Sequence, residues 1–88
     1  MLFDLGSIVA TSGCLRHCQK TNVEPMHLIR RHAVGDWGDI GEEDKRANIQ
    51  AIEHGLRVFS SYLVGTGKVW CITEADRSST CLLLPSEY

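Results

Sequence analysis

The chain has 88 residues, of which 43% are hydrophobic and 23% charged, and its formal net charge is −2. This length holds one small domain over residues 1–88 and excludes two independent cores, while the composition argues against wholesale disorder. This charge argues against a nucleic acid partner, because proteins that coat nucleic acid need a surplus of basic residues.

The first third of the chain predicts two short helices. Ser12 is a typical N-cap residue for the first of them. Pro25 suits the first turn of the second helix, and Gly35 stands where a helix-ending glycine is expected. Residues 2–10 are mostly apolar and predict either an additional strand or an extended lead-in.

The longest predicted helix runs from about residue 40 to residue 54. Asp39 is placed to cap it, and acidic residues follow in the first turn, where the helix dipole favours negative charge. Helical spacing puts Ile49, Ile52 and Leu56 on its buried face.

After this helix the apolar period changes from 3.6 to 2, which predicts strands. Residues 57–64 and 68–73 flank a Gly-Thr-Gly hairpin turn, and residues 80–84 form a third strand. The continuous apolar run of that strand indicates a central position or cover on both faces. We therefore expect an α+β fold in which two or three N-terminal helices pack on one face of a C-terminal antiparallel three-stranded sheet, with an extra N-terminal strand left open.

The four cysteines are expected to be reduced thiols, because the first ten residues lack the basic start of an export signal. Cys14 and Cys18 share a helical face with His17, but the two further ligands of a recognisable zinc spacing are missing. Cys71 and Cys81 fall on adjacent predicted strands and could face each other. We expect no metal, no cofactor, no membrane partner and a cytoplasmic location.

Two polar loops carry the candidate binding residues. In the first, glycines flank an Asp-Trp pair that would present a large aromatic side chain; the alternative is that Trp37 plugs the core. In the second, an arginine beside hydroxyls could hold a phosphate or a carboxylate; the alternative is a solvated turn. The candidate binding residues are Asp36, Trp37, Asp39, Glu74, Asp76, Arg77 and Thr80.

Three segments together resemble a family of small uncharacterised proteins carried on bacterial plasmids and integrative elements. They are RHxxGDWGD at residues 31–39, ITEADRSxT at residues 72–80 and LPxEY at residues 84–88. The resemblance covers most of the chain from about Pro25 onward, and the cysteines lie outside its pattern. It implies an accessory protein of a mobile element that binds a host or element protein, for example to inhibit a host defence system.

Three functions stay open on this basis. The first is a non-enzymatic protein-binding module that uses the two polar loops. The second follows from helices that precede a sheet, which is similar in outline to small barnase- or RelE-like ribonucleases, with His32 or Glu74 as general base and Arg77 holding the phosphate. The third is a homodimer formed through a sheet edge or an exposed apolar helix face, which would complete a small core.

Overall fold

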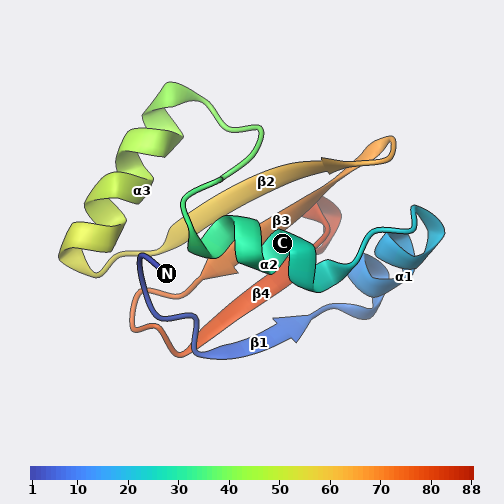
Figure 1. Ribbon diagram of the computed structural model, residues 1–88, viewed down its shortest axis with the longest axis horizontal. Helices are drawn as coiled ribbons and strands as arrows, with labels where there is room; N and C mark the ends of the chain where they lie inside the picture. Colours follow the sequence, from blue (N-terminus) through green and yellow to red (C-terminus); the bar gives the residue numbers. More distant parts are fainter.

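The computed structural model describes all 88 residues, and it contains a four-stranded sheet and three α-helices (Figure 1). The strands are β1 (Ser7–Ala10), β2 (Val58–Val64), β3 (Gly67–Thr73) and β4 (Ser79–Leu83). The helices are α1 (Ser12–Lys20), α2 (Pro25–Ala33) and α3 (Glu42–His54), and a 3₁₀ turn, η1 (Pro85–Glu87), follows β4. The predicted α+β class is confirmed. No helix has the length and apolar character that crossing a membrane requires.

The sheet is mixed and has four strands in the order β1-β4-β3-β2. β2, β3 and β4 form the predicted antiparallel meander, and β1 lies parallel to β4 with Ser7 opposite Ser79. The prediction of three strands is therefore wrong. The sheet has a fourth strand, β1, which is the additional N-terminal strand that the sequence left as an alternative. β4 becomes an inner strand between β1 and β3, which explains its continuous apolar run.

One face of the sheet is covered by α1 and α2, and α2 lies in front of the sheet in Figure 1. Strand alternation turns every second side chain toward these helices. The main core lies in this layer and consists of Cys14, Cys18, Leu28, Ile29, Tyr62, Val64, Val69, Cys71 and Leu82. The N-terminus of α2 begins at Pro25 as predicted, and Gly35, with φ 88°, follows its C-terminus.

α3 packs against β2 at the edge of the sheet. It begins after Gly41, whose backbone is the N-cap, so the prediction that Asp39 caps this helix is wrong. Its buried residues are Asn48 and Ala51, whereas Ile49 and Leu56 are 58% and 52% exposed. The predicted apolar stripe is therefore wrong at Ile49 and Leu56, whereas Ile52 is half-buried and packs against the core.

Candidate functional site

The first polar loop, residues 35–39, runs along the outer edge of β2 and forms hydrogen bonds with it. The Ser61 N–H donates to the carbonyl of Trp37 at 3.1 Å, and the Asp39 N–H donates to the carbonyl of Ser61 at 2.6 Å. Gly38, between them, has φ 75°, and a Cβ there would lie 2.3 Å from the Ser61 oxygen. Only glycine fits this close approach, so the loop's conformation is set by the sheet.

The carboxylates of this loop are held by cations. Arg31 donates two hydrogen bonds to Asp36, at 2.7 and 3.1 Å, and lowers the pKa of that carboxyl. The same guanidinium lies 4.5 Å from the centre of the Tyr62 ring, whose hydroxyl donates to the Asp36 carbonyl. Asp39 pairs with Lys68 at 3.2 Å. Both carboxylates are at the surface, but each already has a partner in the chain.

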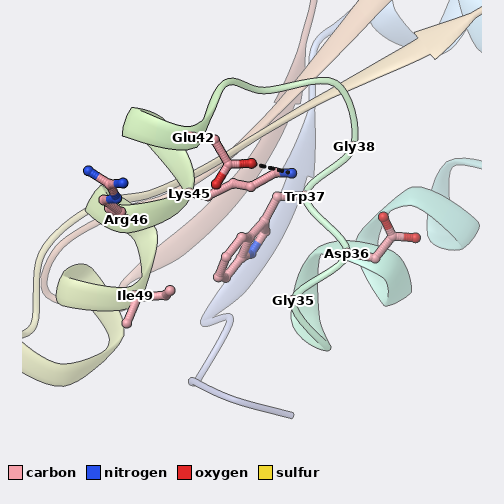
Figure 2. Close-up of a pocket in the computed structure, with 8 residues that line it drawn as sticks. All are labelled: Gly35, Asp36, Trp37, Gly38, Glu42, Lys45, Arg46 and Ile49. Atoms are coloured by element: carbon pink, nitrogen blue, oxygen red, sulfur yellow. Dashed lines mark hydrogen bonds and ion pairs between the residues drawn. The ribbon is translucent and has the colours of Figure 1, made fainter.

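Trp37 is half-buried, and its ring lies between residues 35–38 and α3 (Figure 2). It packs against a small core cluster of Phe3, Ala51 and Val58. Its indole N–H is buried without a hydrogen-bond partner. The residue also lines a cleft of about 400 Å³, together with Lys45 and other α3 residues. The core interpretation and the surface interpretation of Trp37 thus each describe one side of the ring.

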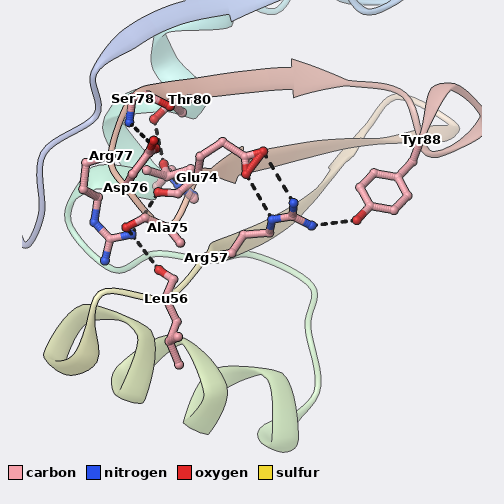
Figure 3. A network of polar contacts seen from close by, with 11 residues as sticks. Leu56, Arg57, Glu74, Ala75, Asp76, Arg77, Ser78, Thr80 and Tyr88 are labelled. Atoms are coloured by element: carbon pink, nitrogen blue, oxygen red, sulfur yellow. Dashed lines mark hydrogen bonds and ion pairs between the residues drawn. The ribbon is translucent and has the colours of Figure 1, made fainter.

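In the second polar loop, Arg77 is used to hold α3. Its guanidinium donates to the carbonyl of Leu56, just beyond α3, at 2.6 Å (Figure 3). It also donates at 2.8 Å to the carbonyl of Ala51, which accepts the Gly55 and Leu56 N–H groups at the end of the helix as well. It also lies over the Phe3 ring, 5.6 Å from its centre. Asp76 accepts the Ser78 N–H at 2.9 Å, which is the local turn hydrogen bond expected of an aspartate there.

Glu74 points to the other side of the sheet and pairs with Arg57. The distance between Arg57 Nε and the nearer carboxylate oxygen is 3.2 Å, and Arg57 also donates to the Tyr88 hydroxyl at 2.8 Å (Figure 3). These three side chains form an exposed polar network that ties the end of the chain to β3 and to the start of β2.

Thr80 and His32 belong to a buried polar chain inside the helix-covered layer. His32 is fully buried, and its two ring nitrogens bond to the hydroxyls of Ser60 and Thr73. Thr73 bonds to Thr80 at 2.7 Å, and Thr80 bonds to the carbonyl of Leu5. Burial lowers the pKa of His32 to about 4, so the ring is neutral at physiological pH.

The two polar loops do not join into one site. No hydrogen bond or ion pair links residues 35–39 to residues 74–80. The small core cluster connects them: Trp37 packs against it, and Arg77 contacts Phe3 and Ala51. The side chains predicted for a ribonuclease do not converge either, since His32 is closed off from solvent, the Glu74 carboxylate is paired with Arg57, and Arg77 is bound to backbone carbonyls, that of Glu74 among them.

Sequence reasoning missed the face of the sheet that none of the α-helices covers, which we call the open face; η1 lies against β3. Its rings stack edge-to-face: Phe59 and Trp70 centres are 5.2 Å apart, and Trp70 and Tyr88 centres are 5.7 Å apart. Leu63 and Tyr88 are 66% and 71% exposed. The apolar side chains on this face are those of Val9, Phe59, Leu63, Trp70, Ile72, Cys81, Leu83 and Tyr88, of which Ile72 and Leu83 are buried and Phe59, Trp70 and Cys81 are half-buried. The signal in the sequence was the alternation of residues 57–64, in which both sets of side chains include large apolar groups.

All four cysteines are free thiols. Cys71 points into the main core and Cys81 lies on the open face, so the two thiols, which the sequence allowed to face each other, do not. Burial raises the pKa of Cys14 to about 12, which keeps this thiol protonated and unreactive. No group of three or more His, Cys, Asp or Glu side chains is placed to hold a metal ion.

Comparison of the chain with protein-family models, with curated proteins and with solved structures gives no match. The resemblance to the plasmid-borne family therefore stays a prediction.

Proposed function

We propose that this protein is a non-enzymatic protein-binding module whose partner docks on the open face of the sheet. The observation that carries the proposal is the aromatic cluster of Phe59, Trp70 and Tyr88 on the side opposite α1 and α2, in which Phe59 and Trp70 are half-buried and Tyr88 is exposed. A sheet face of this kind is flat and rigid, and Tyr and Trp lose little conformational entropy on binding because they have few rotatable bonds.

The charged groups around the cluster support the same proposal. Arg57 and Glu74 form an ion pair on one side of it, and Lys68 and Asp39 form another. All four side chains are between 42% and 57% exposed, so these pairs add little to folding stability. An apolar aromatic centre with a charged rim is the usual anatomy of a protein interface, in which the rim sets orientation and partner choice.

The polar residues that could carry chemistry support a binding role rather than catalysis. All the hydrogen bonds that the Arg77 guanidinium makes are donated to backbone carbonyls. His32 is buried, and both of its ring nitrogens bond to hydroxyl groups. A ribonuclease needs a base and a cation that face one solvent-accessible point, and these residues do not converge. From the sequence resemblance we further propose that the partner is a protein of the host that carries the mobile element, such as a component of a host defence system.

The experiment is affinity capture from a bacterial lysate with four baits. The native chain is compared with an open-face variant, Leu63→Ser with Tyr88→Ala, and with a matched control, Met26→Ser with Val34→Ser, which changes exposed apolar residues on the helix side. The fourth bait is Asp36→Ala. Each bait is first shown to be folded by circular dichroism.

A protein held by the native, control and Asp36→Ala baits and lost by the open-face variant supports the proposal. Loss with Asp36→Ala alone would return the surface to the first polar loop. Equal retention by all four baits, or recovery of RNA or DNA in place of protein, would contradict it.

A further inference from the structure

The two edges of the sheet are finished differently, and the edge at β2 is closed. The side-chain amide of Asn48 donates to the Phe59 carbonyl at 2.6 Å and accepts from the Phe59 N–H at 2.9 Å. The next outward peptide group, that of Ser61, is paired with the first polar loop. Asn48 is 2% exposed, so water does not compete for these bonds. An edge occupied in this way does not accept another strand along these residues.

β1 forms the other edge, and it is open. Ser7 and Thr11 donate their N–H groups to carbonyls of the β4 side at 3.0 Å. Backbone groups alternate along a strand, so Ile8 and Ala10 between them turn their N–H and C=O groups away from β4. No strand lies beyond β1 in the sheet. Edge strands are usually protected by charges or prolines, and residues 7–10 contain neither.

From this open edge we infer that β1 pairs antiparallel with β1 of a second copy of this chain, which joins two four-stranded sheets into one. The complement of an edge strand is an extended strand, and the open edge of a second copy is the same β1. A two-fold axis through Val9 places Ile8 opposite Ala10 of the second copy, and Ala10 opposite Ile8. Residues that face each other in this way exchange two hydrogen bonds per pair, so all outward groups of both strands are satisfied.

The neighbouring chain fixes this register. Gly6 has φ 65°, outside the extended region, and α1 begins at Ser12, so the extended segment is limited to residues 7–10. An axis through Ile8 or Ala10 would leave the other of these residues opposite a residue outside β1. Only the axis through Val9 uses both.

The side chains suit the same pairing. Ile8 and Val9 are 44% and 47% exposed, and pairing would cover both. On the helix side, Ile8 meets the smaller Ala10. On the other side, Val9 meets Val9 of the second copy, which makes the two open faces continuous. This inference rests on the sheet edge and not on the proposed function, so each can fail without the other.

The sharpest test is a cysteine placed on the two-fold axis. Cys81 lies next to Val9 on β4, so the experiment uses Val9→Cys in a Cys81→Ser background. Directly opposed antiparallel residues of this type have Cα atoms about 4.5 Å apart, within the range of a disulfide. On mild oxidation, most of the Val9→Cys chains should run as linked dimers on a non-reducing gel. The matched control is Leu63→Cys in the same background, an exposed position on β2 that should stay unlinked.

A second measurement does not depend on cross-linking. Sedimentation equilibrium of the native chain should show a monomer–dimer equilibrium, and Ile8→Lys should raise the dissociation constant at least tenfold while the circular dichroism stays native. Leu63→Lys should leave the constant unchanged. A native chain that is monomeric at every concentration, equal weakening by both lysines, or equal cross-linking at both cysteines would overturn the inference.

Discussion

The Nε2–H group of His32 donates to the hydroxyl oxygen of Thr73 at 2.9 Å, and the other hydrogen bonds of the buried polar chain fix this direction. The Thr80 hydroxyl donates to the Leu5 carbonyl, so its oxygen accepts the Thr73 proton. The Thr73 oxygen then accepts from His32, and the unprotonated Nδ1 accepts from Ser60. With the neutral ring, every hydroxyl and ring nitrogen in this polar chain has a hydrogen-bond partner, and the polar chain links α2 to β2, β3 and the N-terminal segment.

This arrangement predicts a loss of stability in mild acid. The pKa of His32 is lowered from 6.5 to about 4 in the folded protein, so below pH 6.5 the unfolded chain binds a proton that the folded chain refuses. Stability therefore falls as the pH drops. We expect the free energy of unfolding to fall by about 2 kcal/mol between pH 7 and pH 5. Urea titrations at several pH values measure it.

The control for this prediction is His32→Gln, which should be less stable at pH 7 but show a shallower dependence on pH. The range stops at pH 5 because the carboxyl groups whose pKa values are lowered, among them Asp36 and Glu87, take up protons at lower pH. Equal pH slopes in the two proteins would contradict the assignment.

Arg77→Gln should destabilise the protein by about 2 kcal/mol, because the charged guanidinium holds two carbonyls at the end of α3. Hydrogen exchange should become faster in the last turn of α3. Arg77→Lys should recover only part of the loss, since one ammonium group does not present the fork of donors that reaches both carbonyls. If Arg77→Gln kept full stability and lost a binding partner, Arg77 would be an interface residue instead.

Trp37→Phe should change stability by less than about 1 kcal/mol, whereas Trp37→Ala should cost about 3 kcal/mol. Phenylalanine keeps contact with the small core cluster and removes an indole N–H that is buried without a partner. Thermal or urea unfolding of the two variants measures the difference. A large loss for both would mean that the indole N–H has a partner, such as a bound water molecule.

Asn48→Leu should cost about 3 kcal/mol, because it leaves both the N–H and the carbonyl of Phe59 unpaired at a shielded edge. Asn48→Asp should also be destabilised, since its carboxylate accepts from the Phe59 N–H but repels the Phe59 oxygen. An exposed neighbour on the same helix, Ile49→Ala, serves as the control and should have a small effect. Similar losses at positions 48 and 49 would contradict the closing role of Asn48.

Local chemistry explains what the sequence predicts correctly. The hairpin at Gly65 and Thr66, the helix start at Pro25 and the glycine after α2 each depend on a few adjacent residues. The buried side of α3 depends instead on a distant edge. From the sequence alone, Asn48 is expected at the surface and Ile49 in the core. In the structure the contact with β2 buries Asn48, whereas Ile49 is 58% exposed.

The candidate site was predictable only in part for the same reason. Arg77 binds carbonyl groups of another element, and backbone acceptors leave no mark in the side-chain pattern. Alternation in β2 separates Tyr62 from Leu63, but both are large and apolar, so the pattern does not say which face the helices cover. The first polar loop was found because Gly38 and Trp37 are conspicuous residue types, and its role at the sheet edge became visible only with Ser61 next to it.

The position of β4 between β1 and β3 has a consequence for biosynthesis. Ala10 pairs with Leu82, so β1 has no neighbour until the ribosome has made nearly all of these residues. During that time the early helices lack most of the surface against which they fold, and an apolar extended segment at the start of the chain is without its native partner. We expect the nascent chain to need protection by a chaperone until the last strand is released.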